Sequence, residues 1–266
     1  MNGAIGVFDS GVGGLTVVKE IIEKLPNETI YFFGDTANCP YGDKTKEQII
    51  ENVDKAIKFL IDKNIKIIIL ACNTATAAAL DILKSKYNVP ILGVINAGVK
   101  EAIKSTKNKK VVVLGTRYTI NSNIYPNELK KENNEIEVFG KSCPSFVPFI
   151  EEGKYKDSNL SFELVREELK NFDIKGSDTI VLGCTHYPIL KDSIEKFYGS
   201  DINIVSPSKE VSVELVNELT KYDILSKEKI DDDILFISKN DKNFHETAKN
   251  LLYKNIFIKN LDEIKE

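Results

Sequence analysis

Two cysteines, Cys72 and Cys184, lie 112 positions apart in matching sequence surroundings. Each closes a run of apolar, largely β-branched residues, 67–71 and 179–183, which is typical of a buried parallel strand. Hydroxyl or amide residues and then a helical pattern follow each cysteine. Because the N-terminus of a helix offers free N–H groups and the positive end of its dipole, this setting favours a thiolate over a thiol. The pattern predicts two reactive thiols that face one substrate from opposite sides.

A facing pair of thiols could invert the configuration of a small amino acid. A thiolate on one face would remove the Cα proton, and the thiol on the other face would supply a proton from the opposite side. The reaction leaves the two thiols with exchanged protonation, so the same site works in both directions. Because the Cα carbanion is very basic, such a site must exclude water and hold the substrate carboxylate with strong hydrogen bonds.

Three further positions carry groups that could move a proton in such a site. Asp9 ends the first predicted strand, where its carboxylate is either a helix N-cap or an active-site group. His186 lies two residues after Cys184 and could raise its thiolate content or relay a proton. Adjacent glutamates such as Glu151 and Glu152 are usually solvated, but one of them could supply a carboxylate to the second half of the site. We expect Asp9 beside one sulfur, and His186 or Glu151 beside the other.

The first predicted strand runs into a glycine-rich loop within residues 8–16. Glycines let the backbone approach a ligand, and the helix that follows offers N–H groups to an anion. Gly11 and Gly13 match the first two glycines of a dinucleotide fingerprint, but Thr16 occupies the third position. The loop therefore predicts either a carboxylate- or phosphate-binding turn or a merely tight turn, and not a dinucleotide site.

A second loop, 34–42, follows the next predicted strand and is rich in Gly, Asp, Asn and Pro. Ligands are commonly held at such strand ends, so Tyr41 and Gly42 are candidate substrate contacts. Cys39 and Cys143 each precede a proline and are predicted to pack as small apolar residues. Hydroxyl and amide side chains that could hold the substrate carboxylates are Ser10, Asn73, Thr74, Thr116, Thr119 and Thr185.

Short apolar strands alternate with amphipathic helices along the chain. The predicted strands are 4–8, 29–33, 66–71, 91–95, 110–114, 135–139, 178–183, 202–205, 233–237 and 255–258. The clearest predicted helices are 14–25, 45–63, 74–87, 158–171, 187–198 and 208–221, with a surface helix at 241–251. This alternation predicts an α/β fold with mainly parallel sheets that helices cover on both faces.

A weak internal duplication accompanies the two cysteine segments. It predicts two pseudosymmetric α/β domains. Because open parallel sheets bind ligands at the C-terminal ends of their strands, these ends of the two units would face a shared cleft. We place the first domain at 1–96 plus 208–266 and the second at 97–207. The tail returns to the first domain in this scheme, since a separate piece of that length would have little core.

Composition excludes several classes of function. The 266 residues are 42% hydrophobic and 29% charged, as in a globular protein with a substantial core, and the formal net charge is −4. No basic surplus exists to bind nucleic acid, and no apolar run approaches the roughly 20 residues of a membrane helix. The N-terminal residues lack the pattern of a signal peptide. We expect a cytoplasmic protein with four free cysteines and no metal site, because no His, Cys, Asp or Glu cluster shows metal-ligand spacing.

Five segments together closely resemble glutamate racemase: 6–16, 34–36, 40–42, 71–75 and 183–188. The likeness covers residues 4–210 in order, and the paired cysteine motifs with the glycine-rich loop make it specific. It implies a cofactor-independent enzyme that interconverts L- and D-glutamate and supplies D-glutamate for bacterial peptidoglycan. It also implies two pseudosymmetric α/β domains with the active site between them. The partners expected are the small-molecule substrate, neither nucleic acid nor a membrane, and, as one option, a second copy of the chain in a homodimer.

The resemblance also assigns roles to individual residues. Cys72 resembles the catalytic residue that acts on D-glutamate, and Cys184 resembles the one that acts on L-glutamate. The assisting glutamate matches Glu151, with Glu152 as the alternative. Positions similar to substrate contacts are Asp9, Ser10, Tyr41, Gly42, Asn73, Thr74, Thr185 and His186, with Thr116 and Thr119 near further carboxylate contacts.

Three other functions would fit the same residues. A racemase for aspartate or a hydantoin would use the same pair of thiols. A two-lobed protein that only binds an amino acid or anion would not need them. A redox enzyme would form a disulfide between Cys72 and Cys184.

Overall fold

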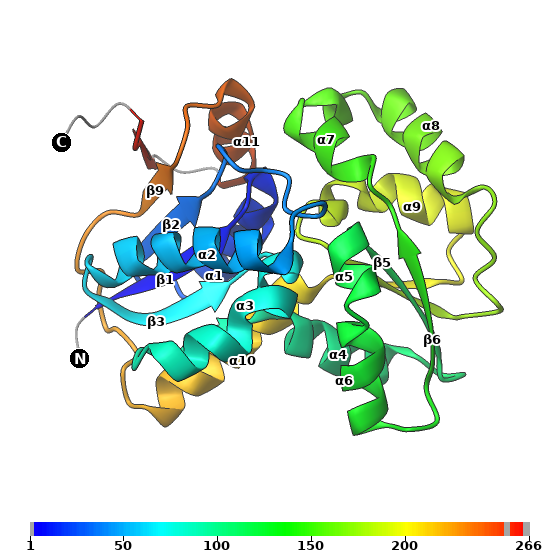
Figure 1. Cartoon of the computed structure of the whole chain (residues 1–266), viewed down its shortest axis with the longest axis horizontal. Helices are drawn as coiled ribbons and strands as arrows, with labels where there is room; N and C mark the ends of the chain where they lie inside the picture. Colours follow the sequence, from blue (N-terminus) through cyan, green and yellow to red (C-terminus); the bar gives the residue numbers. More distant parts are fainter. Residues whose placement is uncertain (1–2, 253–255, 263–266) are drawn as a thin grey trace.

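The computed structural model describes residues 3–252 and 256–262. Two parallel sheets lie side by side, each covered by helices on both faces (Figure 1). One sheet has six strands in the order β10-β9-β2-β1-β3-β4, and the other has four in the order β6-β5-β7-β8. The predicted α/β class with parallel sheets is thus confirmed. We call the part built on the six-stranded sheet the first half and the part built on the four-stranded sheet the second half.

The strands of the first half are β1 (Ala4–Asp9), β2 (Ile30–Gly34), β3 (Ile65–Leu70), β4 (Ile91–Gly93), β9 (Ile234–Ile237) and β10 (Phe257–Asn260). Those of the second half are β5 (Lys110–Gly115), β6 (Glu137–Ser142), β7 (Thr179–Gly183) and β8 (Asn203–Val205). The helices are α1 (Leu15–Lys24), α2 (Lys46–Ile61), α3 (Asn73–Lys86), α4 (Val94–Ser105), α5 (Arg117–Asn121), α6 (Ile124–Glu132), α7 (Phe146–Glu151), α8 (Ser158–Leu169), α9 (Lys191–Tyr198), α10 (Pro207–Lys221) and α11 (Lys242–Leu252). Three 3₁₀ turns complete the fold: η1 (Val12–Gly14), η2 (Lys154–Lys156) and η3 (Tyr187–Leu190).

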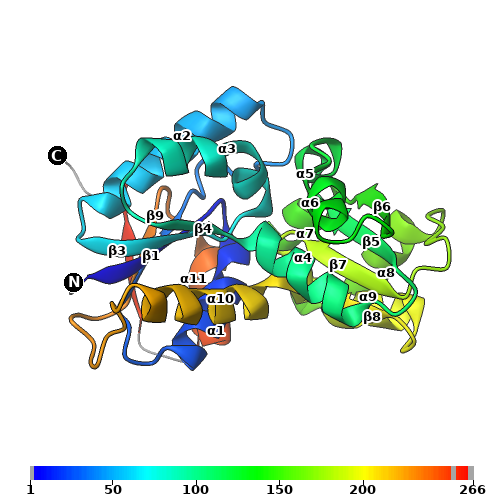
Figure 2. The same cartoon turned by 90° about the horizontal axis from the view of Figure 1, so that it is seen from below.

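The continuous apolar strands form because both faces of each sheet are buried. On β3, Ile67 and Ile69 enter one hydrophobic cluster, whereas Ile68 and Leu70 enter another on the opposite face. Helices α2 and α3 cover one face of the first sheet, and α1, α10 and α11 cover the other (Figure 2). Both faces of a central strand are therefore apolar.

Helices α4 and α10 connect the two halves. The chain leaves the first sheet after β4, and α4 leads it to β5 in the second sheet. It returns after β8 through α10, which packs against α4 and α1. The domain boundaries predicted at 96 and 208 fall inside α4 and in the first turn of α10. The division into two domains at those positions stays a prediction.

Several predicted element bounds are wrong by a few residues. The strand predicted at 91–95 ends at Gly93, because Val94 and Ile95 begin α4 and are buried there as helical residues. The strand predicted at 135–139 lies at 137–142, on a half-exposed sheet edge where the apolar pattern is weak. Of the strand predicted at 255–258, residue 255 lies outside the described residues, and β10 occupies 257–260. Among the described residues, no helix is long and apolar enough to cross a membrane.

Candidate active site

Cys72 lies where β3 turns into α3. It is the N-cap of α3, and its Sγ accepts a hydrogen bond from the Ala75 N–H at 3.4 Å. The Ser10 hydroxyl lies 3.7 Å from the same sulfur. Ser10 follows β1, the strand next to β3, so adjacent strand ends supply both groups.

Burial dominates the acidity of Cys72. Burial, together with the charge of Asp9, raises the pKa of this thiol to about 12. The Ala75 N–H at the helix N-terminus lowers the pKa, as predicted, but this contact and that of Ser10 do not offset complete desolvation. At neutral pH this residue is a thiol.

Cys184 lies at the end of β7 and has a different proton partner. Its Sγ is 3.7 Å from Nδ1 of His186, and Nε2 of the same ring is 2.5 Å from Oε1 of Glu151. Burial lowers the pKa of His186, but its contacts with Cys184, Cys39 and Glu151 outweigh burial and raise that pKa well above 6.5. Burial raises the pKa of Glu151, and hydrogen bonding to His186 outweighs this, so the pKa falls below its usual 4.5. An imidazolium–carboxylate pair therefore stands beside Cys184 at neutral pH.

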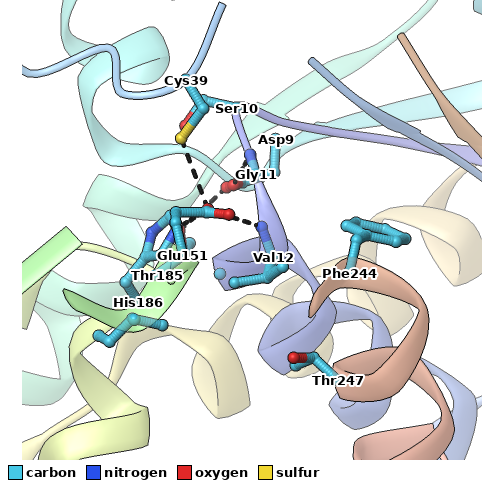
Figure 3. Close-up of polar contacts among 12 residues, drawn as sticks. Asp9, Ser10, Gly11, Val12, Cys39, Glu151, Thr185, His186, Phe244 and Thr247 are labelled. Atoms are coloured by element: carbon cyan, nitrogen blue, oxygen red, sulfur yellow. Dashed lines mark hydrogen bonds and ion pairs between the residues drawn. The ribbon is translucent and has the colours of Figure 1, made fainter. Parts of the chain in front are cut away.

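Glu151, rather than Glu152, reaches this cluster. Oε1 of Glu151 also accepts hydrogen bonds from the Val12 N–H at 3.0 Å and from Cys39 Sγ at 3.5 Å (Figure 3). Glu152 instead forms an exposed ion pair with Lys154. Cys39 packs against the core as predicted, but sequence patterning did not indicate its contact with Glu151.

Asp9 lies at the end of β1 and is fully buried. Its carboxylate accepts hydrogen bonds from the Gly11 N–H and from the Thr185 hydroxyl, both at 3.0 Å. Burial raises the pKa of Asp9 to about 6, although the charge of His186 and these two hydrogen bonds act in the opposite direction.

The two halves enclose a pocket that both thiols line. Its cavity volume is about 30 Å³, room for only about two water molecules at roughly 10–15 Å³ each. An amino acid can therefore bind only if the walls of the pocket move. Exposed Asp43 and Arg117 form an ion pair of 2.7 Å between the halves, and both line the pocket. The predicted site residues that line it are Ser10, Tyr41, Gly42, Cys72, Asn73, Thr74, Thr116, Cys184, Thr185 and His186.

Three predicted site residues lie behind the residues that line the pocket. Asp9 and Glu151 contact wall residues, as described above, and Thr119 is buried beside the threonines that line the pocket. Oγ1 of Thr74 lies 2.9 Å from that of Thr116 and 3.3 Å from that of Thr119. A cluster of hydroxyl groups thus joins the two halves at one end of the pocket and could hold a carboxylate.

Sequence reasoning missed other residues of the site. Asp43 and Arg117 directly follow the predicted contacts Gly42 and Thr116. Their position next to these contacts could have identified them as residues of the site. Tyr125 gave no such signal, yet its buried hydroxyl donates to Asn73 Oδ1 at 2.7 Å. The remaining unpredicted lining residues are Pro40, Pro144 and Val147.

The glycines of the first loop allow the halves to approach closely. A methyl group added at Gly11 would lie 2.0 Å from Glu151 Oε1, and one added at Gly13 would lie 2.4 Å from His186 Nδ1. These glycines therefore admit protein side chains of the second half rather than a phosphate.

One group of residues could in principle hold a metal ion. Within the described ranges, Cys39, Glu151 and His186 bring ligand atoms within 4.8 Å of one another. However, Glu151 Oε1 already accepts hydrogen bonds from the Val12 N–H, from Cys39 and from His186. The three side chains are thus arranged around a carboxylate oxygen rather than around a space for an ion.

The fold and a small pocket lined by two thiols fit an isomerase of the racemase class. Residues 5–211 match the Asp/Glu/Hydantoin racemase family. A protein of Listeria innocua named glutamate racemase is 41% identical over 256 residues, which cover 96% of this chain and 93% of the relative. The chain belongs to the Asp/Glu/Hydantoin racemase family.

Solved structures are similar over nearly the whole chain. The crystal structure of glutamate racemase isoform RacE1 from Bacillus anthracis has a TM-score of 0.91 at 36% identity and covers 98% of both chains. Glutamate racemase from Francisella tularensis, solved in complex with D-glutamate, has a TM-score of 0.88 at 37% identity, covering 98% of this chain and 97% of that one.

Proposed function

We propose that this protein interconverts L- and D-glutamate without a cofactor, with Cys72 and Cys184 as the two acid/base residues. The observation that carries the proposal is that both thiols line one small pocket and have different ionisable neighbours. Similarity to proteins named glutamate racemase favours glutamate over aspartate or a hydantoin. By the same likeness, the protein supplies D-glutamate for peptidoglycan in the cytoplasm, and its pocket lies between domains 1–96 plus 208–266 and 97–207.

In the direction from L- to D-glutamate, Cys184 is the base. His186 Nδ1 lies 3.7 Å from Cys184 Sγ, where the imidazole can take the thiol proton and return it. The Cys184 thiolate takes the Cα proton, and the Cα–H electron pair delocalises into the substrate carboxylate. The Cys72 thiol then gives its proton to the opposite face of Cα. Its raised pKa suits this role, because the thiol stays protonated until the carbanion forms.

The reverse direction exchanges the roles of the two sulfurs. Cys72 must first lose its proton, and the nearby carboxylate of Asp9 accepts it, which also removes the negative charge that raises the pKa of this thiol. The hydroxyl cluster of Thr74 and Thr116, with the Asn73 amide, holds the substrate carboxylates by hydrogen bonds. Since a bound substrate would displace the little water that the pocket holds, these bonds gain strength as negative charge develops at the substrate.

The direct test is α-proton exchange in deuterated water with each enantiomer of glutamate. The purified protein, without added pyridoxal phosphate or metal, should racemise both and incorporate deuterium at Cα, as followed by NMR and optical rotation. Cys72→Ser and Cys184→Ser should each lower kcat by at least about 10³-fold while glutamate still binds. Cys143→Ala is the matched control, because this buried thiol does not line the pocket.

Three outcomes would move the assignment. Inversion of aspartate but not glutamate would favour a racemase for the smaller substrate. Altered affinity with no exchange in any variant would favour a binding protein. Activity that depends on reversible oxidation of the two thiols would favour a redox enzyme.

A further inference from the structure

Helix α11 lies beyond the part of the chain that carries recognisable motifs, yet it contacts the catalytic cluster from behind. It belongs to the first half, and in Figure 1 it lies beside α7 of the second half. Phe244 is fully buried and packs on Phe32 of β2, with ring centroids 5.8 Å apart. Asp241 precedes the helix, and its carboxylate accepts from the Phe244 N–H at 2.8 Å, which caps the first turn. The start of α11 is thus fixed on the first sheet.

Asn243 projects from this fixed turn onto the end of α7. Its Nδ2 donates hydrogen bonds to the carbonyl oxygens of Ile150 and Glu151, at 3.1 and 3.0 Å. Carbonyl groups in the last turn of a helix lack partners within that helix, so this one amide group caps the C-terminus of α7. The contact is close, because a methyl group added at Gly153 would lie 2.6 Å from Asn243 Oδ1.

Glu151 is therefore held at both ends by the first half. Its backbone carbonyl accepts from Asn243, and its carboxylate accepts from the Val12 N–H at 3.0 Å. Between these two anchors the carboxylate meets His186, whose other ring nitrogen faces Cys184. Figure 3 shows Phe244 and Thr247 of α11 in the same view as this cluster. A displacement of the α7 terminus would move the carboxylate away from the imidazole.

We propose that Asn243 is a positioning residue that holds Glu151, and through it His186, in place to support proton transfer at Cys184. An asparagine suits the position because it offers two N–H donors without charge. An aspartate of the same shape would direct a carboxylate oxygen at two carbonyl oxygens, so it would repel the helix end rather than cap it.

The same interface offers a matched control. Thr247 lies one turn further along α11, is fully buried, and its Oγ1 is 2.9 Å from the Tyr155 hydroxyl of the second half. Thr247→Val removes this hydrogen bond with little change in shape. It weakens the contact between α11 and the second half without touching Glu151.

The inference rests on the proposed racemase function, so the activity of the unmodified protein is established first. Asn243→Asp and Asn243→Ala should then lower kcat about tenfold, because general acid–base catalysis typically contributes about 10²–10⁴-fold and only part of it is lost. KM should change less than about twofold, since Asn243 does not line the pocket. Thr247→Val should leave kcat within about twofold. Melting temperatures of all three variants show whether the fold is retained.

A second measurement does not depend on racemisation. The alkylation rates of Cys184 and Cys72 by iodoacetamide are compared by mass spectrometry in the same sample. Asn243→Asp should slow alkylation of Cys184 severalfold relative to Cys72, because the imidazolium moves away from only one of the sulfurs.

Unchanged kcat and an unchanged ratio of alkylation rates in both Asn243 variants would overturn the proposal. Equal losses of kcat in Thr247→Val would reduce Asn243 to a general interface contact. The wild-type protein could lack racemase activity while the Asn243 variants still change the ratio of alkylation rates. That result would refute the proposed function and leave the positioning role intact.

Discussion

The hydroxyl of Thr185 donates a hydrogen bond of 3.0 Å to the carboxylate of Asp9. Thr185 follows Cys184 in the second half, whereas Asp9 lies in the first half and its charge acts on Cys72. The carboxylate that acts on one thiol is therefore held by the strand end that carries the opposite thiol. This contact crosses between the two halves, so the environment of Asp9 depends on how the halves pack together.

The first prediction concerns the pH dependence of the reaction. Burial raises the pKa of Asp9 to about 6, so the carboxylate is protonated below that pH and charged above it. If the charged form assists Cys72, kcat/KM should fall tenfold per pH unit below about pH 6. Asp9→Asn should lower activity by about 10²-fold or more and abolish this limb. The pH profiles of both proteins test this, and an acid limb that persists in Asp9→Asn would assign it to another group.

The second prediction is that Asp9→Asn stabilises the protein. Because its folded pKa of about 6 exceeds the unfolded value of 3.8, ionisation of Asp9 opposes folding. Its favourable contribution is complete below pH 3.8 and is lost as the pH rises through about 6. At pH 8 the variant should gain about 3 kcal/mol in free energy of unfolding, and at pH 4 almost nothing. Denaturant titrations at both pH values measure the difference, and an equal change at the two values would contradict the prediction.

The third prediction concerns the glycine loop. Gly13→Ala places a methyl group 2.4 Å from His186 Nδ1, so either the imidazole or the loop must move. Activity should fall by about 10²-fold because the ring leaves Cys184. Gly140→Ala is the control, because its methyl group meets only the Ile120 side chain, at 3.1 Å. Steady-state kinetics on both folded variants decide the matter, and comparable rates would show that the loop adapts without displacing His186.

The fourth prediction concerns a buried ion pair away from the active site. Lys66 on β3 and Glu28 before β2 are 2.6 Å apart, with side chains only 1% exposed. Glu28 also accepts from the Ser226 N–H and hydroxyl, so the pair anchors the segment after α10. Lys66→Met should cost about 3–5 kcal/mol of unfolding free energy, because it leaves a buried carboxylate without its partner.

Glu28→Gln in the Lys66→Met background should recover much of that loss. Lys55→Met, which breaks the exposed pair with Glu51, is the control and should leave stability unchanged. The free energies of unfolding of the double variant and of the control are measured by denaturant titration. A loss in Lys66→Met no larger than in Lys55→Met would mean that the buried carboxylate finds another partner or becomes protonated.

Local sequence was sufficient for the class of fold and for much of the pocket lining. Runs such as 67–71 and 179–183 are mostly apolar and buried at every position, because both faces of a central parallel strand are covered. The two cysteines follow these runs directly, and parallel strands direct their C-terminal ends toward one edge of a sheet. Positions near strand ends, such as Tyr41 and Thr116, could therefore be selected without knowledge of the tertiary contacts. By contrast, Val94 and Ile95 read as strand residues, because a β-branched pair carries no signal for the turn at which α4 begins.

The sequence by itself determined the strand–helix alternation, the paired thiols and the groups that follow them along the chain. Only the tertiary structure decided which glutamate meets His186, that Tyr125 supports Asn73, and that Asn243 caps α7. These contacts join residues from 35 to 93 positions apart, and no local periodicity encodes them. The protonation of Cys72 was also beyond local reasoning, because the helix N-terminus favours a thiolate while burial, a property of the whole fold, outweighs it.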